Sequence, residues 1–475
     1  MEEWVRQWVQ EQREKGETCL EVKVINGNTY VYRSTSKYDK ETKGPKKVTT
    51  YLGRLTKKHG FIPKGEKAAV IQPRSVHEYG NAALLAEEAA ELIPLLQEAF
   101  PGSWQEIVAL MFARITGYTP LYQVKDRWEK LDNILGITPN CDPQVLSQTL
   151  TAVGGDYSAQ EDIFQFLSSQ SNRLVYDLSF IFSHSDTVNL EEFGYNAEGA
   201  YLPQVNIALF SSLDTNMPVM IRALPGSVKD VSTLAGSLEG IDTDNITLIL
   251  DRGFVSEENE TLLQQLDINF ILPMRRNSRR YEKRIHLKEH FFYHDRLIHA
   301  GSRETGVLTL YLYKDVDLAA DEEKTIYRLF SEGKIDRNTL NERMKRAGKI
   351  LIISSLIAPP QEIYELYKSR NMVESHFKTF KDLIQADKLY LRDATSVFGH
   401  VFVGFLCLYL YCRIQNRIRK AGLLSHLSPQ GLLLKLSKVY SVNSGTDKRI
   451  TEVPKQVRMI AEKLQFNIIP IKTGV

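Results

Sequence analysis

Apolar and polar residues alternate near the start of the chain, a pattern typical of half-buried β-strands. The alternating runs follow residues 1–15, which have the amphipathic spacing of a short helix. Asn26-Gly27 is a preferred pair for a type I′ hairpin turn. Residues 57–74, rich in Lys, Gly and Pro, are predicted to be a linker. We therefore predict a small β-meander module over residues 1–56, with strands at 20–25, 29–36 and 48–52.

Helical signals dominate residues 75–170. Ser103 and Glu106 have the spacing of a capping box at the start of an apolar-periodic helix. Asp142 followed by Pro143 predicts another helix start, and Gly154 predicts its end. We take this region as a helical DNA-binding domain, although short helices in succession suit any helical bundle equally well.

From residue 171 to residue 274 the pattern changes to strands and helices. Three strand-like runs are followed by a helix, a strand, a helix and a last strand. This is the element order of an RNase-H-like sheet with helices on its faces. In chain order the runs cover residues 173–182, 201–210, 218–224, 228–238, 246–250, 256–266 and 268–273.

Residues 275–348 interrupt the core pattern with a basic start, alternating apolar runs and a charged helical piece, which predicts a β-rich insertion. The core resumes in a second part, 349–442, which includes an apolar helix at 397–420 and a last helix opened by Ser428-Pro429. Residues 443–475 read as a tail of mixed charge. The predicted fold class is α/β, an RNase-H-like catalytic core with a β-rich insertion, preceded by the β-meander and the helical domain.

Composition narrows the protein class without changing this outline. Hydrophobic residues make up 43% of the 475 positions and charged residues 25%, as in soluble globular proteins. Because 60 Lys and Arg nearly balance 58 Asp and Glu, any nucleic acid has to bind local patches. The four cysteines include no C-x2-C pair, which predicts reduced thiols in the cytoplasm. The most apolar run, 397–411, is short for a membrane span, so we expect a buried helix and no membrane partner.

Three acids stand out by their setting. Asp177 lies inside an apolar strand, where a carboxylate is costly unless it is paired, for example with an Arg, or bound to a cation. Asp251 ends a buried-type strand, where open α/β sheets place their sites, although an Asp shortly before a Gly is often a turn former. In an RNase-H-like sheet the first and fourth strands are neighbours and a late helix, here carrying Glu374, crosses beside them. We therefore predict one catalytic site formed by Asp177, Asp251 and Glu374.

Residues 363–390 contain no Pro or Gly and follow a Pro-Pro pair, which predicts a single helix. Within about 60° of its circumference, one face presents four polar side chains, Tyr367, Arg370, Glu374 and Lys381. Arg370 can clamp a phosphate bidentately, Lys381 can hold another, and Tyr367 can donate to a phosphate oxygen. These three are predicted to contact DNA. The alternative is a solvated face with i,i+4 ion pairs.

Two Asp and one Glu suit Mg²⁺, which prefers oxygen ligands. Two such ions can activate the attacking oxygen and stabilise the leaving oxygen when a phosphodiester is cleaved. The lack of a C-x2-C pair argues against a zinc nuclease. We therefore predict that Asp177, Asp251 and Glu374 bind Mg²⁺, with Mn²⁺ able to substitute.

The spacing Y-x2-R-x3-E-x6-K resembles the signature around the catalytic glutamate of bacterial DDE insertion-sequence transposases of the IS-four kind. The resemblance extends over about residues 170–440. The first family aspartate corresponds to Asp177 in LVYDLSFIFSHS, the second to Asp251 in LILDRGF, and the glutamate to Glu374. A β insertion between the second aspartate and the glutamate is also a feature of that group. YLGRL at 51–55 is similar to the IS-sixteen-thirty-four subgroup.

The resemblance implies a homodimer that binds the inverted repeats of an insertion sequence in a synaptic complex. It implies cleavage by water and joining of the freed 3′-OH ends to double-stranded target DNA, in the cytoplasm of a bacterium and associated with the nucleoid. Some relatives form a DNA hairpin stabilised by a Trp of the insertion. None of the four tryptophans here lies in 275–348, which puts such a step in doubt.

Three other functions stay open on the sequence. The chain could be an RNase-H-like nuclease without strand transfer, a catalytically inactive DNA-binding descendant, or a structural protein whose near-neutral charge reflects no DNA binding at all. The complete set of acids and signature residues favours the transposase.

Overall fold

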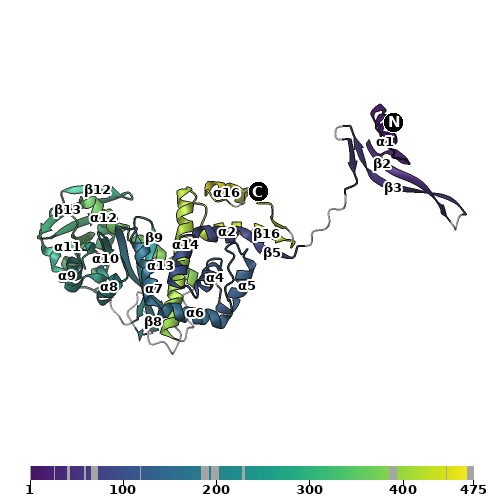
Figure 1. Cartoon of the computed structure of the whole chain (residues 1–475). Helices are drawn as coiled ribbons and strands as arrows, with labels where there is room; N and C mark the ends of the chain where they lie inside the picture. Colours follow the sequence, from purple (N-terminus) through teal and green to yellow (C-terminus); the bar gives the residue numbers. More distant parts are fainter. Residues whose placement is uncertain are drawn as a thin grey trace. The chain divides into compact units, whose positions relative to one another are not determined.

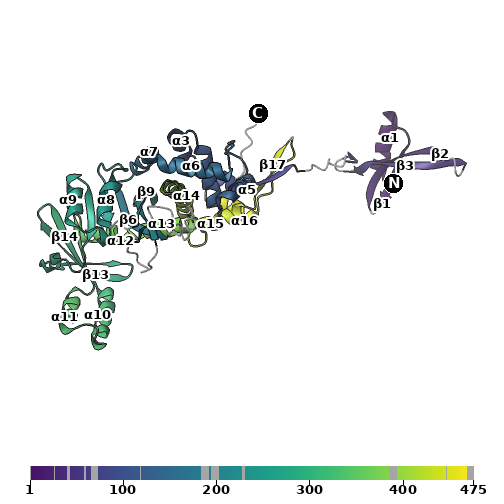
Figure 2. The ribbon, with the colours of Figure 1, turned by 90° about the horizontal axis from the view of Figure 1, so that it is seen from below.

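The structure is a computed structural model of the chain, and it describes residues 2–25, 27–39, 43–57, 60–65, 73–117, 119–182, 192–193, 203–226, 230–384, 393–445 and 447–467. Its contacts divide the chain into two compact units, Met1–Ser75 with Asn443–Lys448, and Val76–Val442 with Arg449–Val475. Each unit has a hydrophobic cluster of its own. Figures 1 and 2 show the elements of both units in two orientations.

The N-terminal unit is an antiparallel sheet with one helix. The sheet order follows the chain, β1-β2-β3-β4. Its small core consists of Val5, Val31 and Leu55, with Trp4 and Trp8 packed against them. The elements are α1 (Glu3–Glu14), β1 (Leu20–Ile25), β2 (Asn28–Asp39), β3 (Gly44–Thr56) and β4 (Gly60–Pro63).

Helix α1 and the three predicted strands are present, but β2 and β3 are longer than predicted. Strand β4 was not predicted. It lies inside residues 57–74, the predicted linker, because Phe61 and Ile62 pair with Leu55 and Arg54 of β3. Gly27 has φ +74°, as a type I′ turn requires, while Asn26 lies outside the described residues.

In the helical region of the larger unit, the sequence pattern predicted the starts of two helices, α4 and α6, and did not separate α2, α3, α5 and α7. The N-cap of α6 was predicted correctly, since the Asp142 side chain accepts a hydrogen bond from the Gln144 N–H. The prediction of a capping box at the start of α4 was wrong. Ser103 precedes α4 but makes no side-chain cap, and Glu106 instead accepts from the Asn140 N–H at 2.8 Å. The elements are α2 (Tyr79–Glu88), α3 (Leu92–Ala99), α4 (Trp104–Ile115), η1 (Leu121–Gln123), α5 (Val124–Lys130), α6 (Pro143–Gly155) and α7 (Tyr157–Ser168).

A large mixed sheet forms the centre of this unit. Its first part has the order β9-β8-β6-β10-β11, with β6, β10 and β11 parallel and β8 and β9 antiparallel to their neighbours. With the two-residue strand β7 left out of the numbering, the first strand, β6, lies beside the fourth, β10, as predicted for an RNase-H-like core. The elements are β6 (Arg173–Phe182), β7 (Glu192–Phe193), β8 (Pro203–Ser212), β9 (Met217–Pro225), α8 (Asp230–Leu238), β10 (Thr247–Leu250), η2 (Arg252–Phe254), α9 (Glu257–Gln265) and β11 (Asn269–Pro273).

These bounds differ from the predicted runs by a few residues at most. Residues 201–202 and 227–229, at the starts of a predicted strand and a predicted helix, lie outside the described residues. Strand β7, which pairs with β8, was not predicted because two residues carry no periodicity.

Residues 275–348 contain three strands and two helices, and the strands are not a separate sheet. Strand β14 pairs with β15, which in turn pairs with β11, so the core sheet continues as β11-β15-β14-β13-β12. The elements are η3 (Arg279–Glu282), β12 (Glu289–Tyr293), β13 (Arg296–Thr305), β14 (Leu308–Asp315), α10 (Val316–Ser331), α11 (Arg337–Arg346) and β15 (Lys349–Ser354).

The apolar helix predicted at 397–420 is α14 (Ala394–Lys420), the central helix of the larger unit. It is long and apolar enough to cross a membrane, but 78% of its most apolar window is buried inside the protein. It therefore serves as a core helix. The remaining elements are α12 (Pro360–Lys368), α13 (Asn371–Ile384), α15 (Pro429–Leu436) and α16 (Lys455–Lys463), with β5 (Ser75–Glu78), β16 (Tyr440–Asn443) and β17 (Lys448–Ile450) in a small sheet of order β17-β16-β5.

The prediction of a single helix over 363–390 is wrong, because α12 ends at Lys368 and α13 begins at Asn371. At the junction the Ser369 hydroxyl donates to the Glu365 carbonyl at 2.8 Å. Such local bonds compete with regular helical geometry and bend helices. Residues 385–390 of the predicted helix lie outside the described residues.

Candidate active site

Three carboxylates that are far apart in the sequence lie together where β10 ends. Strands β6 and β10 are parallel, with Tyr176 beside Leu250, so the following residues, Asp177 and Asp251, are neighbours. Helix α13 contacts β6 and β8 and carries Glu374 in its first turn. The structure thus brings together the three acids singled out in the sequence.

The guanidinium of Arg370 lies among these three carboxylates. Its Nη1 is 3.1 Å from Asp251 Oδ1 and 3.7 Å from Asp177 Oδ2. Its Nη2 is 3.5 Å from Glu374 Oε1. The Arg370 side chain is 15% exposed and that of Glu374 58%, so the contacts with the two aspartates are the shielded ones. Arg370 is therefore a partner of the whole acidic cluster and more than an i,i+4 partner of Glu374.

Asp177 is the most perturbed acid of the cluster. Burial raises its pKa to about 7, and the neighbouring carboxylates of Asp251 and Glu374 act in the same direction. The Arg370 charge and a hydrogen bond from the Leu178 N–H oppose this rise without cancelling it. An acid with such a pKa holds a proton near neutral pH unless a further cation displaces it.

The other two signature residues lie beside this cluster in different ways. Tyr367, at the end of α12, is half-buried, and burial raises its pKa. The Arg370 guanidinium carbon is 5.8 Å from the centre of its ring. Lys381 lies two turns beyond Glu374, with its Nζ 4.6 Å from the centre of the Phe180 ring on β6. Tyr367 thus contacts Arg370 directly, whereas Lys381 contacts the strand that carries Asp177.

The segment of the chain that contains this cluster matches a known family. Residues 176–410 match the family model described as a transposase DDE domain. The match begins beside Asp177 and includes Asp251 and Glu374. The chain is a DDE transposase. The domain implies an RNase-H-like core, in agreement with the strand order, and an enzyme that acts in DNA transposition.

No curated protein matches the sequence of this transposase. Among solved structures, a match is the "Cryo-EM structure of piggyBac transposase synaptic complex with hairpin DNA (SNHP)", at 11% sequence identity and a TM-score of 0.43. The match covers 84% of this chain and 87% of the other. Because a TM-score below 0.5 does not establish a shared fold, the family assignment rests on the sequence match.

DDE transposases use divalent metal ions, and the oxygen donors of this one are of the chemical type that binds such an ion. The three carboxylates supply hard oxygen ligands of the kind that Mg²⁺ prefers. Asp251 Oδ1 is buried and forms no hydrogen bond, and the cation beside it is the Arg370 guanidinium, whose Nη1 is 3.1 Å away. Within the described ranges no three His, Cys, Asp or Glu side chains are arranged to hold one ion. The positive charge at the centre of the acids is that of Arg370.

A cavity of about 1090 Å³ adjoins the acids of the transposase. Its wall is shared by Tyr367 and Arg370 of the site and by α10, α11 and β15. Seven cationic side chains line it against three acids, Asp321, Glu322 and Glu342. The cations are Arg252, Arg276, Arg343, Arg346, Lys349, Lys368 and Arg370. A surplus of positive charge in a concave site attracts a polyanion.

The sequence analysis missed two groups that shape this site. His376, two residues after Glu374, is buried, and its Nδ1 is 2.8 Å from Ser211 Oγ on β8. Burial lowers its pKa to about 4, so the ring is neutral and fixes α13 to the sheet. Lys368 lies over the rings of Tyr364 and Tyr367, and burial lowers its pKa. Local spacing gave no signal for His376, because its partner Ser211 lies on a distant strand. Lys368 stands four residues after Tyr364 on α12, and this i,i+4 spacing was the signal that could have identified it.

Proposed function

We propose that this DDE transposase is encoded by a bacterial insertion sequence of the IS-four and IS-sixteen-thirty-four kind. In this proposal it binds the inverted repeats at the element's ends, cleaves the DNA, and joins the freed 3′-OH ends to target DNA. The observation that carries it is the meeting of Asp177, Asp251 and Glu374 beside a cation-lined cavity. A catalytic core within 171–274 and 349–442, interrupted by 275–348 and preceded by a DNA-binding region at 75–170, is part of the same proposal.

The proposed roles follow from the contacts of each residue. Asp177, Asp251 and Glu374 bind Mg²⁺, or Mn²⁺ in its place, and such ions activate the attacking oxygen and stabilise the leaving one. In the metal-free site Arg370 offsets part of the negative charge of the acids, and with a metal ion in its place its guanidinium would match a DNA phosphate bidentately. Tyr367 holds Arg370 through its ring, and Lys381 provides a second phosphate contact.

The cavity supports a nucleic-acid substrate over a small neutral one. Several cations that line the cavity form no ion pair with an acid in the described part of the chain, and Lys349 is one of them. Burial lowers the pKa of Lys349, and the nearby charge of Lys314 lowers it further. Like charges held together in this way are stabilised by phosphates. We further propose that two copies act together in a synaptic complex in the bacterial cytoplasm, each with this site.

The test is cleavage of a labelled duplex carrying the DNA ends that flank the gene in its element. We expect Mg²⁺-dependent cutting at the element boundary and none with EDTA. Asp177→Asn, Asp251→Asn and Glu374→Gln should each abolish cutting and retain DNA binding, because each keeps the shape and removes a metal-binding charge. Asp382→Ala, an exposed acid on the same helix as Glu374, is the matched control and should cut normally.

Other outcomes separate the competing functions. Cutting without joining of the 3′-OH end to a target duplex indicates an RNase-H-like nuclease without strand transfer. Binding without cutting by the wild type indicates an inactive DNA-binding descendant. Near-normal cutting by one of the three isosteric variants removes that residue from the proposed metal ligands.

A further inference from the structure

The outer parts of β2 and β3 form a two-stranded ribbon without a core. We call residues 33–39 and 43–50 the distal ribbon. Except for Ser34, Asp39 and Gly44, each of these residues is exposed, so both faces of the ribbon are open. Figures 1 and 2 show the two strands continuing together beyond α1. A two-stranded ribbon is marginally stable alone in water, so two open faces call for a partner.

Charge on the distal ribbon is strongly one-sided. The distal ribbon holds five Lys and Arg residues against one acid, a net charge of +4, whereas the entire chain carries +2. Lys37 lies directly opposite Lys46, and Ser36 opposite Lys47. Residues directly opposite in an antiparallel pair share a face, and like charges there are destabilising. An anion placed between Lys37 and Lys46 relieves this repulsion.

The ion pairs within the unit neutralise this charge only weakly. Lys46 is 3.4 Å from Asp39 and Lys47 is 2.8 Å from Glu21, and the two lysine side chains are 72% and 61% exposed. Exposed pairs of this kind contribute at most about 1 kcal/mol. Lys37 forms no ion pair with any residue that the structure describes.

The chemistry of the ribbon fits DNA better than a protein. Its remaining side chains are mostly hydroxyls, which donate to phosphates and base edges. Only Tyr38 and Val48 are exposed large apolar side chains, too few for the apolar centre of a protein interface. The major groove of B-DNA, about 12 Å wide, admits a two-stranded β-ribbon.

We propose that the distal ribbon is a second DNA-binding arm of this transposase, inserted into a groove of double-stranded DNA. It adds phosphate contacts to those at the catalytic site and lies on a separate compact unit. This inference rests on the proposed function, because it takes the substrate of the enzyme as the partner of the arm.

The test compares full-length proteins by the salt dependence of their binding to a fluorescent 40-base-pair duplex of random sequence, a length of about four helical turns. The ribbon variant is Lys37→Ala with Lys46→Ala and Lys47→Ala. Each lysine that contacts a phosphate contributes about 0.9 to the slope of log K against log salt concentration, so the slope should fall by up to about 2.7. The control is Arg6→Ala with Arg13→Ala and Lys15→Ala, exposed cations of the same unit near α1, which should leave the slope unchanged.

Each outcome decides the proposal. An unchanged slope in the ribbon variant overturns it, and so does an equal fall in the control, which indicates a general effect of net charge. Unchanged DNA binding with an altered sedimentation coefficient assigns the ribbon to a protein contact instead. If the wild type cuts element ends and the ribbon variant binds as tightly, the arm is refuted and the proposed function stands. If the wild type neither binds nor cuts DNA, the proposed function fails as well.

Discussion

At the level of single residues, the site consists of three carboxylates around one guanidinium. Asp177 has a side-chain exposure of 16%, and Arg370, its cationic partner, is shared with Asp251 and Glu374. One positive charge does not neutralise three negative ones, so the cluster has a net negative charge, which protonation of Asp177 reduces without removing. Burial is the main cause of the raised pKa of Asp177, and the charges of the neighbouring carboxylates add to it.

This arrangement predicts how the stability of the metal-free protein depends on pH. In the unfolded chain Asp177 loses its proton near the ordinary aspartate pKa of 3.8, whereas in the folded protein it keeps the proton up to a pKa of about 7. Between these values the unfolded state binds fewer protons, so the free energy of unfolding falls as pH rises. The loss is about 4 kcal/mol at most. It is measured by urea unfolding in EDTA from pH 4.5 to 7.5.

Asp177→Asn is the reference for this measurement, because it removes the titration and keeps the shape. His376 acts in the opposite direction, since its pKa of about 4 makes the folded state lose stability as pH falls below the ordinary value of 6.5. The difference between wild type and Asp177→Asn isolates Asp177. A difference that stays constant with pH contradicts the raised pKa.

The acids themselves were predictable from the sequence, and their partner was not. Asp177 stands inside an apolar strand and Asp251 directly after one, so local pattern was enough to select them. The ion pairs from Arg370 to the two aspartates join positions far apart in the chain. These two ion pairs depend on the end of α12 just before Arg370. No Gly or Pro in the sequence indicates that end, so local spacing suggested only the i,i+4 pair of Arg370 with Glu374.

At the level of secondary-structure elements, α6 and α14 cross with their backbones in close contact. A Cβ added at Gly154 would be 1.8 Å from the Thr395 carbonyl oxygen, and one at Gly399 would be 1.9 Å from the Leu150 carbonyl oxygen. The two glycines thus let the helix backbones touch. This contact joins the helical region to the central helix of the core.

Gly399→Ala should therefore destabilise the protein by about 1–3 kcal/mol or more, because the clash is with backbone and not with a side chain that can turn away. Chemical denaturation measures the loss. Gly236→Ala on α8 is the matched control, since the nearest atom to an added Cβ there is 3.7 Å away. In that helix Ala is favoured over Gly by up to about 1 kcal/mol. Equal effects of the two substitutions on stability would show that α6 and α14 can move apart without a loss in the free energy of unfolding.

The strands of the core were predicted closely, and the elements that extend or join it were not. Strand β6 has its predicted bounds because its apolar run is long and ends in polar residues. The sequence of 275–348 predicted strands but not that β14 pairs with β15, since pairing partners come from distant segments. Helix α7 follows α6 after a single residue, Asp156, so the sequence pattern offered no loop between them.

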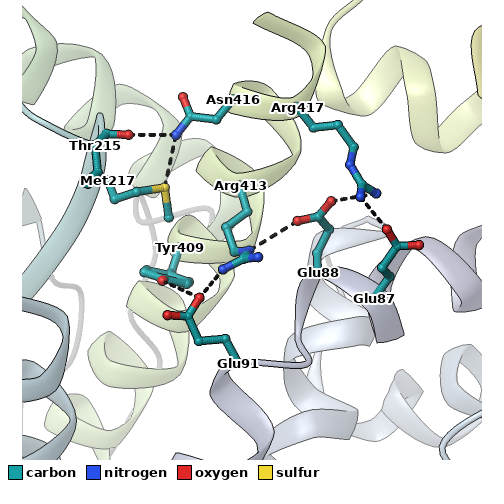
Figure 3. A network of polar contacts seen from close by, with 9 residues as sticks. All are labelled: Glu87, Glu88, Glu91, Thr215, Met217, Tyr409, Arg413, Asn416 and Arg417. Atoms are coloured by element: carbon teal, nitrogen blue, oxygen red, sulfur yellow. Dashed lines mark hydrogen bonds and ion pairs between the residues drawn. The ribbon is translucent and has the colours of Figure 1, made fainter. Parts of the chain in front are cut away.

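At the level of the whole larger unit, a network of charged side chains joins α14 to α2 and the start of α3 (Figure 3). Arg413 Nε is 3.2 Å from Glu88 Oε2, and Arg417 Nη1 is 3.0 Å from Glu88 Oε1. Arg413 also pairs with Glu91, and Arg417 with Glu87. The side chain of Glu88 is only 6% exposed, so it is the shielded centre of the network. The network holds the helical region and the catalytic core as parts of one unit.

A double-mutant cycle with Glu88→Ala and Arg413→Ala measures this link as the coupling in the free energy of unfolding. We expect a coupling of about 1–3 kcal/mol, because the two groups share a partly buried network. It should change little with salt, since the carboxylate is shielded from solvent. Glu342 and Lys345 on α11, 2.8 Å apart and 57% and 70% exposed, provide the control cycle. Their coupling should stay below about 1 kcal/mol and fall with salt. If the two cycles give the same coupling, the network does not fix α14 to α2, and the packing of α6 on α14 through Gly154 and Gly399 is then the main join between the helical region and the site.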